Sequence, residues 1–229
     1  MTRFYSSLLL STTLATACAS TDVGNPISTE IEFAGYQGSG PQPDALVLDN
    51  GLTIEEAFIK VRSFQLDRSE ACDDVDNSFD GVVLVDLLEQ TQSESPFWLD
   101  EAGTFCRLRL KFTTDAVESQ PTELTDAALW VKGTTRNGES FELQLTAEST
   151  LSLSGPFTLP EGSHLLQVAF YLDEWFAGID ESALVSGLSE SDSEAFERNL
   201  LTSARLFHDA NQDGELDTTE IATSLAYGE

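Results

Sequence analysis

Basic residues are scarce in this chain of 229 residues. Lysine and arginine together number 11 against 40 aspartates and glutamates, so the formal net charge is −29 at pH 7. A surface of that sign repels the phosphates of nucleic acids and of anionic lipid headgroups, which excludes both as partners. The same charge favours solubility and makes weak binding of divalent cations easy.

Long hydrophobic runs and familiar catalytic motifs are also missing. After the N-terminal segment no stretch approaches the roughly 18 apolar residues of a membrane-spanning helix, so we expect a chain that does not cross a bilayer. The sequence has no Gly-x-Ser-x-Gly elbow, phosphate-binding loop, His-Glu-x-x-His zinc motif or dinucleotide fingerprint. We therefore expect a protein that is not an enzyme. A glycoside hydrolase with two catalytic carboxylates is the less favoured alternative, because so acidic a chain always offers such a pair.

Cysteine is rare, and the first of the three cysteines follows what reads as an export signal. Residues 1–17 combine a positive start, a short apolar centre and the small residues Ala15–Ala17, as a signal peptide does. Cys18 after those residues resembles the lipobox of bacterial lipoproteins, although the favoured leucine lies one place early, at Leu14. The resemblance implies that the Cys18 thiol is acylated and anchors the chain to a membrane. Because Ala19 is not aspartate, it implies the outer membrane of a bacterial cell envelope.

The alternative to a lipid anchor is ordinary cleavage after Ala17, which would give a secreted protein. Residues 18–43 read as a tether that follows the acylated cysteine, with Gly and Pro as breakers. Within this tether the alternating run Ile27–Tyr36 favours a first strand.

The two other cysteines, Cys72 and Cys106, are expected to form a disulfide. Export implies an oxidising compartment, and pairing them leaves Cys18 as the odd cysteine that lipidation uses. The bridge would close a loop of about 35 residues and contribute about 3–4 kcal/mol in the chain-entropy model. A metal site or a nucleophile is the alternative, but no Cys or His lies at ligand spacing. His164 and His208 are each isolated in the sequence.

Residues 44–172 show a period of two that is typical of β-strands. In Cys106–Phe112 apolar residues alternate with three bases, which predicts a strand with one buried face that includes its first residue. The run Ala57–Leu66 predicts another strand with a bulge near Ser63, and Asn137–Gly138 between two apolar runs predicts a hairpin. At least seven such strands predict a mainly β domain, an antiparallel β-sandwich of immunoglobulin-like or related topology. A single sheet closed on itself is the alternative.

Basic side chains gather on two of the predicted strands. We expect them on exposed faces, in cross-strand pairs with neighbouring acids; a positive docking face is the alternative. The residues are Lys60, Arg62, Arg107, Arg109 and Lys111.

Residues 173–229 change to a period of three to four, which predicts a C-terminal helical unit. Trp175 and Phe176 form an aromatic corner that we expect to pack in the core, with a sugar-stacking platform as the alternative. A capping box that starts at Ser191 opens a helix, and apolar residues three or four apart continue that helix to Phe207. We therefore expect this helix to lead directly into the acidic stretch that follows.

The twelve residues from Asp209 to Glu220 are the one stretch whose spacing dictates a chemistry. Oxygen-bearing side chains fall at positions 1, 3, 5, 9 and 12, with glycine at position 6 and an aliphatic residue at position 8. The pattern resembles the EF-hand calcium loop, in which a short chain wraps a hard cation that takes about six to eight oxygens. The resemblance implies Ca2+ as the cofactor. Its ligands would be Asp209, Asn211, Asp213, the backbone carbonyl of Glu215, Asp217 and Glu220.

The chain departs from the EF-hand family at both ends of this loop. His208 stands where a hydrophobic residue is usual, and Ile221–Tyr227 leaves only about two turns for an exit helix. Calcium sensors pair two such loops to open a groove, whereas Leu216 at position 8 has no second loop to meet. We therefore expect a structural calcium site that holds the C-terminal unit in place.

Together these features favour a calcium-binding, surface-anchored, non-catalytic lipoprotein. Its lipobox, sandwich, Val85–Leu88 run and acidic tail resemble a loose class of bacterial sandwich lipoproteins, a resemblance that implies no activity. The expected partners are the calcium ion and, through Cys18, a membrane, together with a protein or carbohydrate ligand that the sequence does not identify. A carbohydrate-binding or adhesion module is the alternative. Trp98, Trp130 and Trp175 exposed in a line on one sheet face would favour it.

Overall fold

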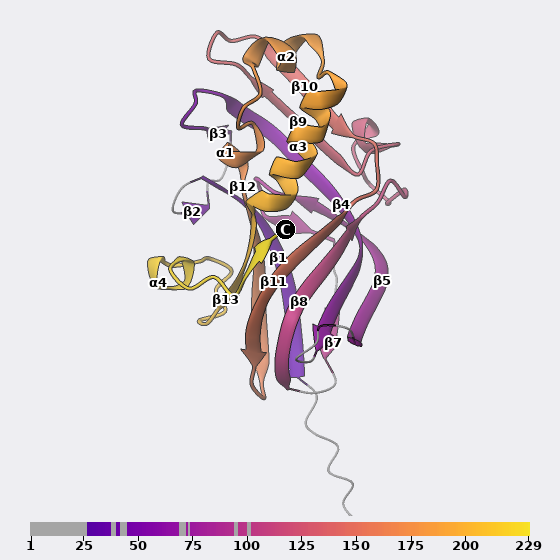
Figure 1. The fold of residues 1–229 in the computed structure, drawn as a ribbon, viewed down its shortest axis with the longest axis vertical. Helices are drawn as coiled ribbons and strands as arrows, with labels where there is room; N and C mark the ends of the chain where they lie inside the picture. Colours follow the sequence, from indigo (N-terminus) through magenta and orange to yellow (C-terminus); the bar gives the residue numbers. More distant parts are fainter. Residues whose placement is uncertain are drawn as a thin grey trace, which may run out of the picture.

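The structure is a computed structural model that describes residues 27–37, 40–41, 45–68, 72, 74–93, 96–99 and 102–229. The expected signal peptide, Cys18 and much of the expected tether lie outside the described residues. Strands dominate the described part of the chain, so the prediction of a mainly β fold is confirmed (Figure 1). No helix in the described ranges has the length and apolar character needed to span a membrane.

The strands and helices have the following bounds. The strands are β1 (Ile27–Gln37), β2 (Gly40–Pro41), β3 (Leu46–Val47), β4 (Thr53–Arg68), β5 (Asp74–Asp86), β6 (Thr91–Gln92), β7 (Pro96–Leu99), β8 (Gly103–Phe112), β9 (Leu129–Thr134), β10 (Ser140–Leu145), β11 (Thr150–Leu159), β12 (Ser163–Tyr171), β13 (Ala204–Asp209) and β14 (Ala226–Gly228). The helices are α1 (Leu172–Trp175), α2 (Glu181–Ser186), α3 (Glu190–Ser203) and α4 (Thr218–Ile221), with a 3-10 turn η1 (Thr122–Leu124).

All of these strands join one sheet, so the predicted β-sandwich is not confirmed. Within the described residues the sheet has 14 strands, and its main order is β10-β9-β4-β8-β11-β14-β13-β12-β1-β2. It nearly closes on itself, because the backbone N–H of Gly35 in β1 donates to the carbonyl of Leu87, just after β5, at 2.7 Å. The prediction of an antiparallel sheet is also wrong at one place, since β1 pairs with β12 in parallel.

The sheet draws strands from both ends of the chain. β1 comes from the expected tether, where Ile31 and Phe33 are buried in the main core. From the expected helical unit, β13 pairs with β12, and β14 lies between β13 and β11. The last strand of the chain therefore fills a gap in the middle of the sheet.

Two bulges show how the longest strand and its neighbour bury apolar residues. The pairing of β4 with both β5 and β8 shifts between Val61 and Ser63, which confirms the bulge expected there. In β8 a second shift skips Cys106, because Asp67 pairs with Arg107 and Arg68 pairs with Phe105. Phe105 is buried and Cys106 only partly so, and the prediction that Cys106 lies on the buried face is therefore wrong.

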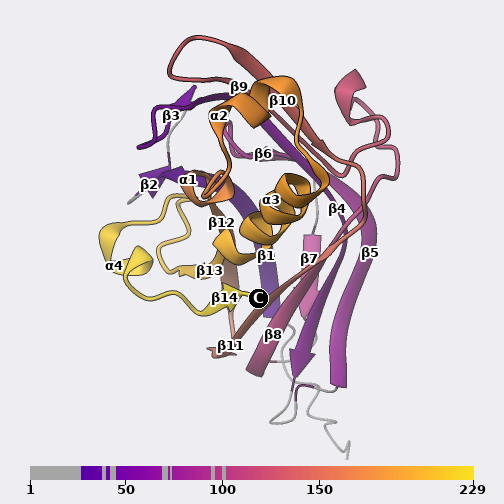
Figure 2. The same ribbon diagram turned by 45° about the horizontal axis from the view of Figure 1, so that its top comes forward.

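Helices α1, α2 and α3 gather near one end of the sheet, as Figures 1 and 2 show. Ser189 caps α3, its hydroxyl accepting from the backbone N–H of Asp192, so the cap lies two residues before the predicted cap Ser191. α3 turns Phe196 and Leu200 into the core against Trp175. Trp175 is fully buried, and Phe176 is also buried, so the aromatic corner packs in the core and cannot serve as a sugar-stacking platform.

Candidate functional site

The acidic loop from Asp209 to Glu220 follows a strand and not a helix. α3 ends at Ser203, and β13 then runs to Asp209, so the expected helix does not lead directly into the loop. After the loop, α4 ends at Ile221 and the chain returns to the sheet as β14, which replaces the expected two-turn exit helix. Figure 1 shows the loop and α4 projecting from one side of the sheet, between β13 and β14.

The first and last residues of the loop are buried and bind its backbone. Asp209 accepts from the N–H of Gln212 at 2.6 Å and from the N–H of Gly214 at 2.8 Å. Glu220 reaches back across the loop and accepts from the N–H groups of Ala210 and Asp217, each at 2.8 Å. The two carboxylates therefore fix the loop at both ends.

Shorter turns shape the middle of the loop. Asn211 accepts from the N–H of Asp213 at 3.1 Å, and Asp213 accepts from the N–H of Glu215 at 2.9 Å. Gly214 has φ +80°, a backbone conformation that favours glycine, and this is the position where the calcium loop requires a sharp turn. Asp217 caps α4, and the backbone N–H groups of Glu220 and Thr219 lower the pKa of its carboxyl.

Leu216 attaches the loop to the outer face of the sheet. It is buried in a small cluster with Ala34, Tyr36, Ala169 and Phe207, separate from the main core. A polar chain runs beside this cluster: the Tyr36 hydroxyl donates to Gln167 Oε1, and Gln167 Nε2 donates to the carbonyl of Gly214 at 3.1 Å. Burial raises the pKa of Tyr36, which keeps the hydroxyl a donor. The sequence shows no second loop for Leu216 to pack against, and in the structure Leu216 packs against residues of the sheet.

Buried acids in this protein fall into two kinds. Asp67 is fully buried and pairs with Arg107 and Arg109, each at 2.6 Å. Asp209 and Glu220 are 0% and 7% exposed, and no described Lys, Arg or His forms an ion pair with either. Backbone N–H groups satisfy their hydrogen bonds but supply no full positive charge, and buried charges are normally paired or bound to a metal.

The loop carboxylates do not converge on one point in this structure. Among the described residues no three His, Cys, Asp or Glu side chains form a group that could hold a metal ion. The reason is visible in the hydrogen bonds, because Asp209, Asp213 and Glu220 each direct oxygens to backbone N–H groups of the loop.

A cleft of about 420 Å³ opens between this loop and β1. Its walls include Glu30 and Glu32 of β1, His164 of β12, and Asp213 and Gly214 of the loop. Burial raises the pKa of Glu32, and the negative charges of Glu30 and Asp209 raise it further. Negative charge therefore accumulates on this side of the molecule, and the described lining residues include no lysine or arginine.

The two histidines are partners, although they are isolated in the sequence. β12 and β13 bring His164 Nδ1 within 3.2 Å of His208 Nε2, and His164 Nε2 lies 2.6 Å from the carbonyl of Pro160. Burial lowers the pKa of His208, and the neighbouring His164 lowers it further. Only the pairing of strands that are 44 residues apart creates this contact.

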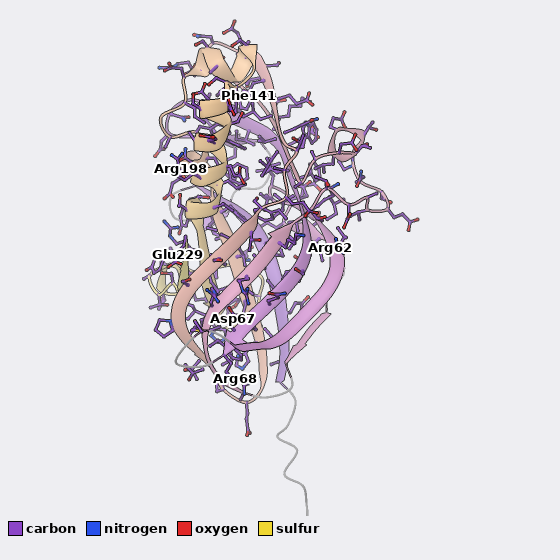
Figure 3. All side chains as sticks on the ribbon, turned by 45° about the vertical axis from the view of Figure 1, so that its right-hand side comes forward. Arg62, Asp67, Arg68, Phe141, Arg198 and Glu229 are labelled. Carbon is purple, nitrogen blue, oxygen red and sulfur yellow. A yellow bond between two sulfur atoms is a disulfide. The ribbon has the colours of Figure 1, made fainter. Side chains whose placement is uncertain are left out.

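The disulfide between Cys72 and Cys106 is present, with a Cα–Cα distance of 5.8 Å. Arg107 links it to the buried acid of β4, since its guanidinium donates to Asp67 and to the carbonyl of Cys72 at 2.9 Å. Figure 3 follows β4 from Arg62 through Asp67 to Arg68 at its lower end. The bridge therefore ties residue 72 to the sheet where the bulge of β8 occurs.

The remaining bases predicted on the strands are Arg62, Lys111 and Lys60, and they differ in their exposure. Arg62 pairs with Asp115 at 3.0 Å, and Lys111 pairs with Glu148 at 2.8 Å, so both bases pair with acids as expected. These acids lie in loops, however, and not on neighbouring strands. Lys60 is instead fully buried, so its predicted exposure is wrong. Its Nζ donates to the carbonyls of Leu124 at 2.8 Å and Thr114 at 3.1 Å, and burial lowers its pKa.

Comparison with known proteins adds little beyond this geometry. No protein-family model matches the chain, and no curated protein matches it. Among solved structures, MbnP from Methylosinus trichosporium is similar with a TM-score of 0.43 at 14% sequence identity. The likeness covers 76% of this chain and 87% of that chain. A similarity of this size carries no argument about function.

Proposed function

We propose that the loop from Asp209 to Glu220 binds calcium and that the ion fixes the C-terminal strand in the sheet. The observation that carries the proposal is the burial of Asp209 and Glu220 without an ion pair to a described base, in contrast to Asp67 with its two arginines. A divalent cation supplies the missing positive charge. The EF-hand-like spacing of the oxygens supports calcium as that cation.

The residues that would hold the ion are those of the loop pattern: Asp209, Asn211, Asp213, the carbonyl of Glu215, Asp217 and Glu220. The ion would supply charge neutralisation and oxygen coordination, with no chemical step. To bind it, the carboxylates would share oxygens between the ion and the backbone N–H groups that they already contact. An affinity of about 10⁻⁴–10⁻³ M, typical of extracellular modules, suffices outside a cell.

A structural role fits the position of the loop better than a sensor role. The loop connects β13 to β14, and Leu216 packs on the sheet instead of on a second loop. β14 is short, and its neighbour Leu225 donates to the carbonyl of Leu206 at 2.7 Å. An ion in the loop therefore decides how firmly this last strand stays paired.

Hydrogen exchange with and without a chelator tests the proposal. Removing calcium with EDTA should speed exchange at the amides of Leu225 and of β14, and the double variant Asp209→Asn/Glu220→Gln should exchange fast in either condition. The control Glu161→Gln/Glu194→Gln makes the same charge change at exposed positions and should behave as the wild type. Unchanged protection of β14 in EDTA would remove the proposal.

We also propose that the mature chain is an outer-membrane lipoprotein without catalytic activity. The support is the lipobox-like sequence before Cys18. Metabolic labelling with palmitate should mark the wild type and leave Cys18→Ala unmarked, because the thiol is the acylated atom. Equal labelling of the two proteins, or none in either, would contradict the anchor and leave a secreted protein.

The carbohydrate-binding alternative has no support from the described tryptophans. Trp130 and Trp175 are both buried, at 4% and 0% exposure, so neither offers a face to a sugar. The side chain of Trp98 lies outside the described residues.

A further inference from the structure

A second cavity lies far from the calcium loop in the chain, on the outer face of β4 and β5. Its volume is about 960 Å³, which is within the range of small-molecule sites. One wall is the turn after β5, and the other is the loop of residues 113–128 that leads to β9. Phe58 of β4 and Leu84 of β5 line the cavity between these walls.

The floor of this cavity is apolar and fixed in position. Phe58 and Leu84 are only partly buried, and both pack against a buried cluster of Leu124, Ala127 and Trp130. The Phe58 ring stacks on the Trp130 indole with centroids 5.8 Å apart and planes 16° from parallel. The Phe58 ring at the cavity is therefore held in position by the ring of Trp130, its paired residue on β9.

The rim of the cavity is acidic, and no lining residue is basic. Lys132 pairs with Glu56 at 3.1 Å and lies 4.0 Å from Glu55, so one positive charge offsets part of the negative charge of these two acids. Glu89 in the turn after β5 and Glu118 in the loop of residues 113–128 are exposed and form no ion pair with a described residue. The lining also includes Asp86, whose carboxylate accepts from the N–H groups that follow it.

The wall loop already holds one ammonium group. Lys60 lies two residues beyond Phe58 on the same face of β4, and its Nζ bonds to the carbonyls of Thr114 and Leu124. The two carbonyls that accept from this ammonium group belong to the loop that forms this wall of the cavity. A positive group beside that wall meets carboxylates on the rim and an aromatic face below.

From this geometry we infer that the cavity binds an organic ammonium ion whose apolar body rests on Phe58 and Leu84 while its charge faces Glu89 and Glu118. Two sources carry that chemistry: a small aromatic or aliphatic amine, and a lysine side chain of a peptide. A specific site should require both the positive charge and the apolar body of the ligand. Diffuse attraction to a chain of net charge −29 would instead bind any cation, with or without an apolar body.

Isothermal titration with three matched probes tests the inference on the whole chain. 2-Phenylethylamine should bind, whereas 2-phenylethanol, which lacks the charge, and ethylamine, which lacks the body, should bind at least about tenfold more weakly. A short peptide with one lysine separates the two sources: tighter binding than the amine assigns the site to a protein segment, and weaker binding assigns it to a small amine. Equal binding of all probes, or of none, would overturn the inference.

Three variants show whether the cavity itself is the site. Glu89→Gln/Glu118→Gln should weaken 2-phenylethylamine binding about fivefold, since two exposed charge contacts are lost. Glu161→Gln/Glu194→Gln removes the same charge at exposed positions outside the cavity lining and should leave binding unchanged. Phe58→Leu should weaken binding of the aromatic amine by removing the ring. Equal losses in the two double variants would show diffuse attraction and contradict the site.

Discussion

Two buried aspartates in this protein differ in the partners that surround their carboxylates. Asp67 lies in β4 between two guanidinium groups, whereas Asp209 at the end of β13 has only backbone N–H partners among the described residues. The chain itself supplies the countercharge for Asp67, whereas for Asp209 we propose that a cation from outside the chain supplies it. The two acids should therefore respond differently to substitution and to calcium.

Substituting Asp67 tests the first case. Asp67→Asn leaves Arg107 and Arg109 beside a neutral amide and should lower the free energy of unfolding by about 3 kcal/mol, with or without calcium. Urea denaturation measures the change. Asp115→Asn removes the exposed partner of Arg62 and should cost less than about 1 kcal/mol. Equal effects of the two substitutions would contradict the importance of burial at Asp67.

The buried Lys60 predicts a pH dependence. Burial lowers its pKa from 10.5, so at alkaline pH the unfolded chain holds this proton when the folded protein has released it. The contribution of Lys60 to the free energy of unfolding therefore rises with pH between its folded pKa and 10.5. Urea denaturation from pH 8 to pH 10 should show this rise in the wild type and lose it in Lys60→Met. A parallel pH profile for the two proteins would contradict it.

For single residues, the sequence predicted the spacing of the loop side chains but not which residues of other strands lie near them. The loop spacing from Asp209 to Glu220 is visible as letters, because its ligands are local. The cleft acids Glu30 and Glu32, and the contact of His164 with His208, depend on strand pairing over long distances. Lys60 was placed on an exposed face because alternation reports the side of the sheet and not what covers that side.

Elements of the C-terminal segment were misassigned for a related reason. The apolar residues Phe196, Leu200, Ala204 and Phe207 are three or four apart and fit one helix stripe. In the structure α3 carries the first two, while β13 carries the others. Leu206 enters the main core and Phe207 enters the small outer cluster, so β13 is buried on both faces. Consecutive apolar residues of this kind lack the period-two signal of a half-exposed strand.

The attachment of the acidic loop to the sheet gives a prediction at this scale. Leu216→Ala removes the side chain that packs against Phe207 and Tyr36, and should cost about 2–3 kcal/mol at this rim of the structure. Exchange at the loop and β14 amides should accelerate, and calcium affinity should fall. Val185→Ala truncates an exposed apolar residue and should change neither. Normal calcium affinity in Leu216→Ala would contradict the coupling between loop and sheet.

At the scale of the whole molecule, composition and periodicity predicted the mainly β class. The arrangement of the strands depends on contacts between residues far apart in the sequence, which no local pattern predicts. Seven or more alternating runs suffice for a mainly β fold, and cysteine parity suffices for Cys72–Cys106. The parallel pairing of β1 with β12 joins segments more than 130 residues apart. The contact of Gly35 with Leu87 that nearly closes the sheet joins residues 52 positions apart (87 − 35 = 52). A sandwich and a nearly closed sheet share the same strand signals, so the sequence favoured the wrong one.

Calcium titration of the purified chain by isothermal calorimetry tests the proposed site most directly. The wild type should show a saturable heat with one site and a dissociation constant of about 10⁻⁴–10⁻³ M, and Asp209→Asn/Glu220→Gln should lose that heat while Glu161→Gln/Glu194→Gln keeps it. An absence of heat up to millimolar calcium, or the same heat in the Asp209/Glu220 variant, would contradict calcium binding at this loop.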